Sequence, residues 1–226
     1  GLCIKKCPAN NPVYKNNSRP KCYAAFGGDE IRMKSSSGAI FSLISSKILA
    51  KGGYVCGAAY DDKFVLKHTL VSSEEDMQKL RESKYVQSDT NTVYREIGDK
   101  LKEGKPVLFC GCGCQVAGLN AYLDAKKISD EQLFTLDLMC HGSPSPKLFE
   151  KYINEVHGGP ENLESISFRS KEYFGWSTEM NVKYKDGSVY RKTRGIDPYY
   201  KAFLPCISVR KSCGTCNSAK LPRQGD

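Results

Sequence analysis

Several features are scarce in this chain of 226 residues. Its apolar runs fall short of the roughly 18 to 20 residues that span a bilayer, so we expect a soluble protein without a membrane span. It has no internal repeat and no low-complexity segment, which argues against a repeat array. Its three histidines, His68, His141 and His157, show no paired spacing. The usual second ligand pair of a Cys/His zinc module is therefore missing.

Cysteine, in contrast, is abundant. The chain has 11 cysteines, and Cys110, Cys112 and Cys114 stand on alternate residues. A chain of this length buries enough apolar surface to fold without disulfide bonds. Thiols this dense indicate a reducing compartment and metal or redox chemistry, so we expect a cytoplasmic protein.

The charge is basic and evenly spread. With 34 Lys and Arg against 25 Asp and Glu, the net charge is +9, and no run of five like charges occurs. Such an excess suits acidic partners, such as a phosphorylated cofactor, an acidic electron carrier or nucleic acid. A merely soluble basic surface is the simpler interpretation. We do not expect a nucleic-acid partner.

The middle of the chain predicts a βαβ unit. Residues 106–110 and 133–140 are apolar and strand-like, and the helix-like stretch 116–127 lies between them. Such crossovers pair their strands in parallel, and parallel strands end at the same edge of a sheet. Cys114 and Cys140 are therefore expected to become neighbours, at the edge where open α/β sheets commonly bind ligands.

The flanking patterns predict a mixed α/β fold, with the βαβ-containing sheet as its core and an added β-hairpin region. Residues 35–53 predict a helix with Ser before it and Gly52 and Gly53 after it, and 54–60 a strand. Helices are also expected near 93–103, 146–156 and 198–205, and strands within 164–170 and 178–193, where Asp186–Gly187 predicts a turn. We divide the chain into 1–34, the end of a ferredoxin-like domain plus a linker, 35–92, the N-terminal part of the main domain, and 93–226, its C-terminal part.

Four cysteines form the predicted metal site. Cys213 and Cys216 have the C-x-x-C spacing, which on its own suits half a zinc site, half an iron–sulfur site or a redox dithiol. Adding Cys114 and Cys140 gives four thiolates, a ligand set that suits a [4Fe–4S] cluster. Cys112 competes with Cys114 for this place.

The remaining cysteines divide into two groups. Cys56, Cys110 and Cys206 lie in apolar segments, where a free thiol behaves as a small hydrophobe, and Cys22 is assigned to the core in the same way. Cys3 and Cys7, with Pro8 behind them, have the spacing of the last two ligands in a bacterial ferredoxin run. We therefore expect them to be ferredoxin-type cluster ligands and the chain to be a piece of a longer polypeptide.

Several segments, in order, carry a family resemblance. They are "PKCYAAF", "SSSGAIFSL", "ESKYVQSD", "GKPVLFCGCGCQVAGLNAYL", "LDLMCHGSPSP", the Gly175–Trp176 pair and "RKSCGTC". From about residue 20 to the end, the chain resembles the coenzyme F420 hydrogenase/dehydrogenase beta-subunit family. The family's usual Gly-Thr-Pro-Cys-Gln loop is Gly111–Gln115 here, which matches Cys114 to the family cysteine and leaves Cys112 as an additional thiol. Its Ser-Gly-Gly is Ser37-Gly38-Ala39, which we interpret as a mild change.

The resemblance implies an oxidoreductase with FAD and one [4Fe–4S] cluster, and hydride transfer to or from coenzyme F420 or another two-electron acceptor. The expected partners are a ferredoxin or another redox protein, and hydrogenase or dehydrogenase subunits. The expected FAD-binding residues are Ser35, Ser36, Ser37, Gly38, Lys84, Tyr85, Gln87 and Ser88. The serine stretch precedes a helix whose free N–H groups would hold the pyrophosphate, although an ordinary serine cap is the alternative.

His141 is the expected catalytic residue. It follows Cys140 directly, so it is expected to donate a hydrogen bond to cluster sulfur or a proton to reduced flavin. A histidine that only caps a turn is the alternative. Tyr85 and Trp176 are candidates to cover the flavin ring, with core packing as the alternative for both.

Two other functions stay open at this level. One is a zinc-stabilised module whose basic surface binds an acidic partner. The other is a dithiol redox protein that uses Cys112 with Cys114, or Cys213 with Cys216. Iron, zinc and flavin analysis distinguishes the three.

Overall fold

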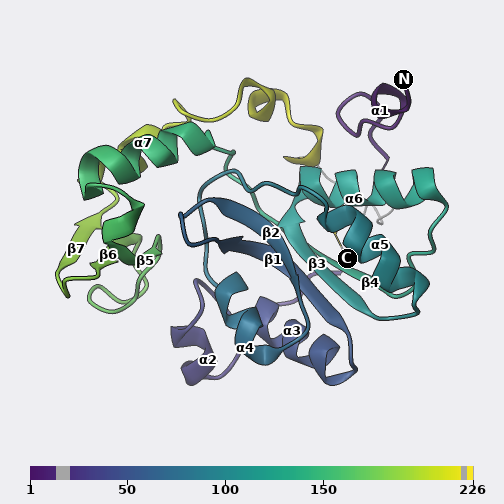
Figure 1. Cartoon of the computed structure of the whole chain (residues 1–226), viewed down its shortest axis with the longest axis horizontal. Helices are drawn as coiled ribbons and strands as arrows, with labels where there is room; N and C mark the ends of the chain where they lie inside the picture. The colour runs from purple at the N-terminus through teal and green to yellow at the C-terminus, as the bar shows by residue number, and fades with distance from the viewer. Residues whose placement is uncertain (14–20, 220–222, 226) are drawn as a thin grey trace.

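The structure is a computed structural model that describes residues 1–13, 21–219 and 223–225, without the side chains of Leu2 and Cys3. After a short helix α1 (Leu2–Lys5), the described chain forms two sheets with helices around them. Figure 1 shows the larger sheet in the middle of the molecule and the smaller one at one end. No helix in the described part of the chain is long and apolar enough to cross a membrane.

The larger sheet has the strand order β2-β1-β3-β4. Its strands are β1 (Tyr54–Tyr60), β2 (Leu66–Val71), β3 (Val107–Cys112) and β4 (Leu133–Leu138). β3 pairs in parallel with both β1 and β4, while β2 is antiparallel to β1. The crossover from β3 to β4 through α6 (Gly113–Lys126) confirms the predicted βαβ unit.

Helices cover both faces of this sheet because successive strand residues point to opposite sides. Val107 and Phe109 pack against α5 (Val93–Lys102) and α6, whereas Leu108 packs on the opposite face against α3 (Ile40–Ala50). α4 (Glu74–Met77) and the 3-10 turn Gln78–Leu80 cover the same face as α3, and α2 (Asp29–Met33) lies beside them (Figure 1).

The smaller sheet is antiparallel, with the order β5-β6-β7. It consists of β5 (Leu163–Ser167), β6 (Glu179–Tyr184) and β7 (Val189–Thr193), and β6 and β7 form a hairpin with Gly187 at φ +84° in its turn. The helices α7 (Pro146–His157) and α8 (Pro198–Phe203) pack against it. A short 3-10 turn, Pro160–Asn162, leads into β5.

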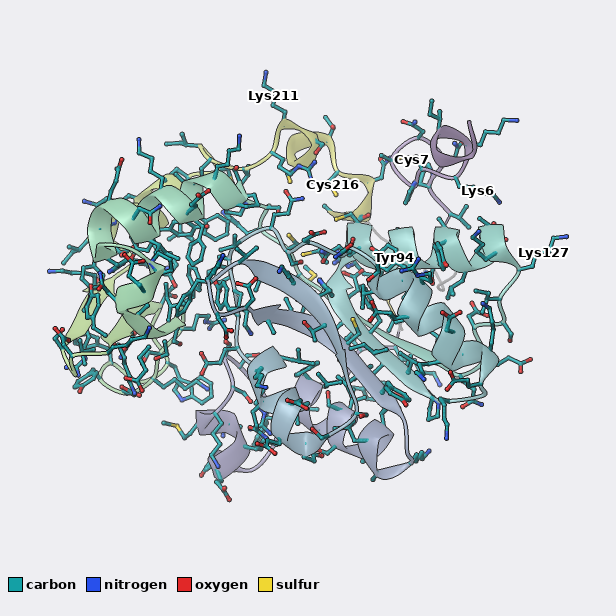
Figure 2. The ribbon with its side chains drawn as sticks, viewed as in Figure 1. Lys6, Cys7, Tyr94, Lys127, Lys211 and Cys216 are labelled. Carbon is teal, nitrogen blue, oxygen red and sulfur yellow. The ribbon has the colours of Figure 1, made fainter. Side chains whose placement is uncertain are left out.

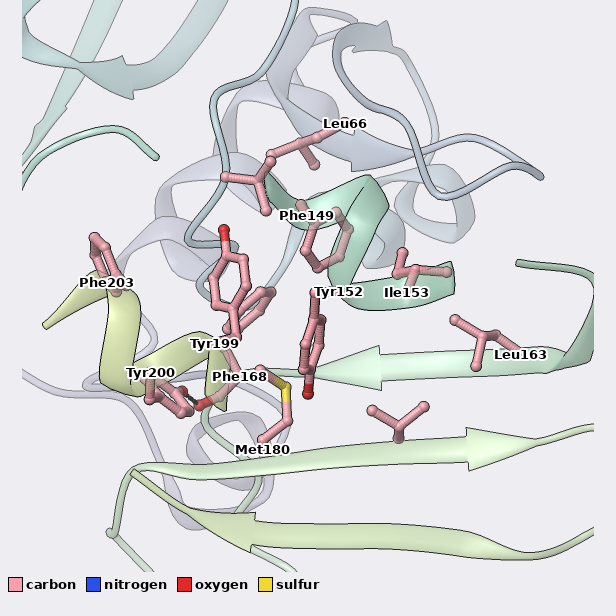
Figure 3. Close-up of a cluster of buried hydrophobic side chains, with 12 residues drawn as sticks. Leu66, Phe149, Tyr152, Ile153, Leu163, Phe168, Met180, Tyr199, Tyr200 and Phe203 are labelled. Atoms are coloured by element: carbon pink, nitrogen blue, oxygen red, sulfur yellow. Dashed lines mark hydrogen bonds between the residues drawn. The ribbon is translucent and has the colours of Figure 1, made fainter. Parts of the chain in front are cut away.

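Large aromatic side chains fill the space between this sheet and its helices (Figure 3). We call this buried cluster the aromatic core; it comprises Leu66, Val86, Phe149, Tyr152, Ile153, Leu163, Phe168, Met180, Val182, Tyr199, Tyr200 and Phe203. Leu66 and Val86 belong to the part of the chain around the larger sheet. The aromatic core therefore joins the two sheets.

The predicted mixed α/β fold is confirmed, as are the strand 54–60, the helices and the Asp186–Gly187 turn. The helices α1, α2 and α4 and the strand β2 were not predicted from the sequence. The division into three segments stays a prediction, and the larger sheet takes strands from both 35–92 and 93–226.

Candidate functional site

The parallel pairing of β3 and β4 brings two of the predicted cysteine ligands to one edge. Cys112 is in register with Leu138 at the ends of the two strands. Cys114 follows in the first turn of α6, and Cys140 lies two residues beyond β4. Both thiols are on exposed residues. This edge is the one at which an open α/β sheet commonly binds its ligand.

The C-terminal segment carries the other two predicted ligands to this edge. Cys213 lies in the 3-10 turn Lys211–Thr215, Cys216 follows it, and a second turn, Asn217–Ala219, comes next. Gly113 permits the close approach, because a Cβ there would lie 3.0 Å from Cβ of Ser218. Arg223 connects the C-terminal segment to β4. Its Nη2 donates to Asp137 on β4 (2.5 Å), and its Nη1 donates to the Ser218 carbonyl (2.9 Å).

The four cysteines act on one another electrostatically. Burial raises the pKa of Cys114, and so do the neighbouring Cys216, Cys140 and Cys213. Thiolates that repel one another in this way are stabilised by a shared positive centre. We call Cys114, Cys140, Cys213 and Cys216 the thiol cluster. Among the described residues, no three His, Cys, Asp or Glu side chains are arranged to hold a single metal ion. Four thiolates are the donor set that iron–sulfur centres commonly use.

Cys112 has a different position from the thiol cluster. It precedes α6 as the N-cap, and its thiol is hydrogen-bonded to that of Cys140. The interaction between the two thiols lowers the pKa of Cys140 and raises that of Cys112. The Gly142 N–H also donates to Cys140 Sγ (3.4 Å). This favours Cys140 as a ligand and Cys112 as its hydrogen-bond partner.

The N-terminal segment lies beside the thiol cluster. Lys6 forms an ion pair with Asp124 on α6 (2.5 Å), and the Asn217 side chain donates to the Ala9 carbonyl (3.3 Å). Figure 2 shows Cys7 in this segment, on the same side of the molecule as Cys216. The side chain of Cys3 lies outside the described part, so its predicted role as a ligand stays a prediction, as does that of Cys7.

A cavity of about 400 Å³ adjoins the thiol cluster. Cys112, Cys140 and Gln115 line one part of it, and the stretch before α3 lines another. Of the predicted FAD and catalytic residues, Ser35, Ser36, Ser37, Lys84, Tyr85, Ser88 and His141 line this cavity. Gly38 and Gln87 are not among its lining residues. Its volume lies in the range of roughly 300 to 1,000 Å³ that ligand sites occupy.

The N-terminus of α3 differs from the expected serine cap. The N-cap is Ala39, in the left-handed conformation at φ +68°, and no side chain caps the helix. Ser36 Oγ instead accepts a bond from Ser83 N (2.7 Å), and Ser35 Oγ donates to the Ile31 carbonyl (2.8 Å). The substitution in Ser37-Gly38-Ala39 is therefore not mild, because glycine adopts this conformation without the cost that alanine incurs.

The cavity has more positive charge than the sequence analysis expected. Burial lowers the pKa of Lys84 to about 8, and its Nζ donates to the carbonyls of Arg81 and Glu82. Arg81 and Arg169 also line the cavity, and the Nε atoms of both are buried without a hydrogen-bond partner among the described residues. Neither arginine lies in a motif that marks a ligand site. A buried, unpaired guanidinium nitrogen is costly unless an anion accepts its bond.

His141 is exposed, and its Nε2 lies 2.9 Å from the Leu204 carbonyl and 3.3 Å from Cys206 Sγ. The prediction that Cys206 is a core residue is wrong, because it is exposed in a loop at φ +63°. Cys22 is likewise exposed, whereas Cys56 is buried as predicted. Cys110 is half-buried and lines the cavity.

Of the two aromatic residues predicted to cover the flavin ring, only Tyr85 lines the cavity. Tyr85 lines the cavity and also stacks on Phe203 at 5.1 Å between ring centroids. Trp176 is 52% exposed, lies under Lys171 Nζ at 3.6 Å from its ring centroid, and does not line the cavity.

Comparison with known proteins gives one family and one fold. The family model for the C-terminal part of the coenzyme F420 hydrogenase/dehydrogenase beta subunit matches residues 104–226, more than half of the chain. A solved chain of the F420-reducing [NiFe] hydrogenase complex from Methanosarcina barkeri is similar in structure, with a TM-score of 0.58 and 16% sequence identity. The match covers 90% of this chain and 69% of that one. Curated protein sequences give no match.

Proposed function

Because this chain belongs to the coenzyme F420 hydrogenase/dehydrogenase beta-subunit family, we propose that it is an iron–sulfur flavoprotein oxidoreductase. In this proposal the thiol cluster holds a [4Fe–4S] centre and the neighbouring cavity holds FAD. Such a pair supplies one-electron transfer at the cluster and two-electron hydride chemistry at the flavin. The acceptor or donor is coenzyme F420 or another two-electron carrier.

The observation that carries the proposal is the shared wall between the two sites. Cys140 belongs to the thiol cluster and also lines the cavity, as does its hydrogen-bond partner Cys112. A ligand in the cavity would therefore lie directly against a cluster ligand. Two redox groups on either side of one residue are close enough to exchange electrons, which suits a protein that converts between one-electron and two-electron transfer.

The cavity residues have roles that suit FAD. Arg169 and Arg81 offer unpaired N–H groups to an anionic phosphate, and Lys84 contributes a further cation. The stretch Ser35–Ser37 presents hydroxyls and backbone before α3. Tyr85 offers an aromatic face that the aromatic core holds in place. His141, at the edge shared with Cys140, remains our candidate for moving a proton.

The electrons are proposed to enter near the N-terminal segment. The Ala9 carbonyl accepts a bond from Asn217, the residue after Cys216, so ferredoxin-type clusters bound by Cys3 and Cys7 would lie on the side of the thiol cluster that carries Cys216. By analogy with the complex that contains the similar structure, hydrogenase or dehydrogenase subunits are the proposed further partners, beside a ferredoxin.

Anaerobic purification followed by iron, sulfide and flavin assays tests the proposal. We expect a brown protein with four iron and four sulfide per thiol cluster, as a [4Fe–4S] centre requires, and one FAD per chain. A colourless protein that contains zinc would contradict it and support the zinc-stabilised module. Iron-free protein whose reactive thiols change in number on oxidation would support the dithiol alternative.

A further inference from the structure

The parallel pairing of β1 and β3 stops before either strand ends. The last paired residues are Cys56 and Phe109, while β1 continues to Tyr60 and β3 to Cys112. Val107 N donates to the Gln132 carbonyl, on the β4 side. Because alternate residues of a parallel strand bond to opposite neighbours, Cys110 and Cys112 direct their backbone groups toward β1. The register ends at Cys56 and Phe109, so the Cys110 carbonyl and the Cys112 N–H lie beyond the last pair.

Three side chains take the place of the missing strand. His68 Nε2, from β2, lies 3.1 Å from the Cys110 carbonyl, and its Nδ1 lies 2.9 Å from Ser88 Oγ. Gln115 Nε2, from α6, donates to Ser88 Oγ (2.9 Å), and Gln115 Oε1 accepts from Cys112 N (3.0 Å). All three side chains line the cavity. They therefore bridge the gap beyond the last β1–β3 pair, which we call the fork, and they form part of the cavity wall.

The direction of every hydrogen bond in this series is determined. A carbonyl only accepts, so His68 Nε2 carries the proton that the Cys110 oxygen receives. With His68 neutral, Nδ1 is then the acceptor, and the single Ser88 hydroxyl proton goes to it. Ser88 Oγ can consequently only accept from Gln115. This agrees with the orientation of the Gln115 amide, because its Oε1 accepts from Cys112 N and its Nε2 is the atom that faces Ser88. Burial lowers the pKa of His68, which is consistent with the neutral ring.

We propose that His68, Ser88 and Gln115 are positioning residues that hold this fork open and fix the Cys112 N–H at the start of α6. In doing so they position the junction of β3 and α6, which runs from the cavity wall at Cys110 and Cys112 to Cys114 of the thiol cluster. They also determine what this wall offers a ligand, because Ser88 has no proton left to donate and presents only a lone pair. The consequence for FAD rests on the proposed function, whereas the positioning itself does not.

The first test uses the anaerobically purified protein with the cofactors it retains. Nitrogen NMR of wild type should show His68 as the neutral ring protonated at Nε2. The variants Ser88→Ala and Gln115→Ala should exchange the Cys112 amide proton at least about tenfold faster, as expected when a buried hydrogen bond is lost. Ser88→Thr keeps the hydroxyl and should preserve protection. Ser208→Ala, which removes another partly buried hydroxyl bonded to a carbonyl, is the matched control and should leave Cys112 unchanged.

The second test measures FAD binding to anaerobically prepared, flavin-free protein that retains its iron. Ser88→Ala should raise the dissociation constant about tenfold and shift the flavin absorption bands, whereas Ser208→Ala should do neither. If wild type binds no FAD, the proposed function fails and the amide exchange still decides the positioning. A His68 ring protonated at Nδ1, or Cys112 exchange unchanged in both Ser88→Ala and Gln115→Ala, would overturn the inference.

Discussion

The thiol cluster and the aromatic core are built by opposite means. In the aromatic core, Phe168, Tyr199, Tyr200 and Phe203 are each no more than 2% exposed, and Phe168 and Tyr199 lie 5.6 Å apart between ring centroids. In the thiol cluster, short side chains from separate segments meet at the end of a sheet, and two of the four residues are exposed. Little apolar surface is buried there.

This difference separates the source of stability from the site of function. Burial of large rings stabilises the aromatic core by itself, since the hydrophobic effect scales with the apolar area removed from water. The thiol cluster has no such contribution, and its cysteines repel one another once ionised. We therefore expect the thiol cluster to become ordered through the centre it binds, and the aromatic core to be independent of that centre.

Removal of one cluster ligand should give the largest effect. We expect Cys140→Ala to remove the iron of the thiol cluster, about four iron per chain, from anaerobically purified protein, because a [4Fe–4S] centre is held by all of its thiolates. The aromatic core should keep the variant folded, as measured by near-UV circular dichroism. The matched control is Cys206→Ser, which alters an exposed thiol bonded to His141 and should leave the iron content unchanged. Iron retained in Cys140→Ala would exclude Cys140 as a ligand.

The reverse experiment weakens the aromatic core. Phe149 is 3% exposed and packs against Tyr60, Phe168 and Tyr199. Phe149→Ala should lower the free energy of unfolding by about 3 to 5 kcal/mol, the usual cost of the cavity that such a truncation leaves. Iron per folded molecule should stay at the wild-type value. Denaturant unfolding and iron assay measure the two quantities, and an equal loss of both would show that the two regions are not independent.

The sequence predicted the fold where its patterns were local. The βαβ unit from 106 to 140 has apolar strands, a helix of the right length and the parallel pairing that such a crossover enforces, so the meeting of Cys114 and Cys140 followed from it. β2 was not predicted, because His68 and Thr69 interrupt the apolar pattern of "LKHTLV". In the structure its residues nevertheless alternate between buried and exposed over most of the strand. The position of His68 in a series of hydrogen bonds depends on residues 20 and 42 positions away.

The candidate site was predicted less completely. Cys206 was assigned to the core because apolar residues precede it, whereas the chain turns through the left-handed region there and exposes the thiol. Arg169 follows β5 and reaches the cavity only because the smaller sheet packs against the larger one. Such placements arise from tertiary packing, and no spacing in the sequence encodes them.

Arg169 offers a way to change function without disturbing either region. Its buried Nε has no partner, so an anionic ligand group in the cavity would accept its bond. Arg169→Gln should weaken FAD binding about ten- to hundredfold, since a hydrogen bond to a charged group contributes about 1.5 to 3 kcal/mol. Fluorescence titration with FAD measures this. The control is Arg191→Gln, which removes a cation stacked over Tyr173, outside the lining of the cavity. Equal affinity in the Arg169 variant would exclude it as a phosphate-binding residue.

The smallest expected effect is the pH dependence of stability, to which each region contributes one histidine. Burial lowers the pKa of His68 beside the cavity and of His157 in contact with Tyr152 of the aromatic core. The two rings are 7% and 4% exposed, respectively. His157 Nδ1 lies 2.6 Å from the Tyr184 hydroxyl, and its Nε2 is buried with no hydrogen-bond partner in the described part of the chain.

A histidine with a lowered pKa is protonated in the unfolded chain at a pH where the folded protein still keeps it neutral. The unfolded state therefore binds more protons, and the free energy of unfolding decreases as the pH falls below the ordinary value of 6.5. Each histidine contributes a slope of at most about 1.4 kcal/mol per pH unit. Denaturant unfolding of cofactor-free protein between pH 7 and 5 should show a shallower slope in both His68→Gln and His157→Gln. If only His157→Gln flattens the curve, the acid destabilisation comes from the aromatic core alone, and His68 binds a proton equally well in the folded and the unfolded protein.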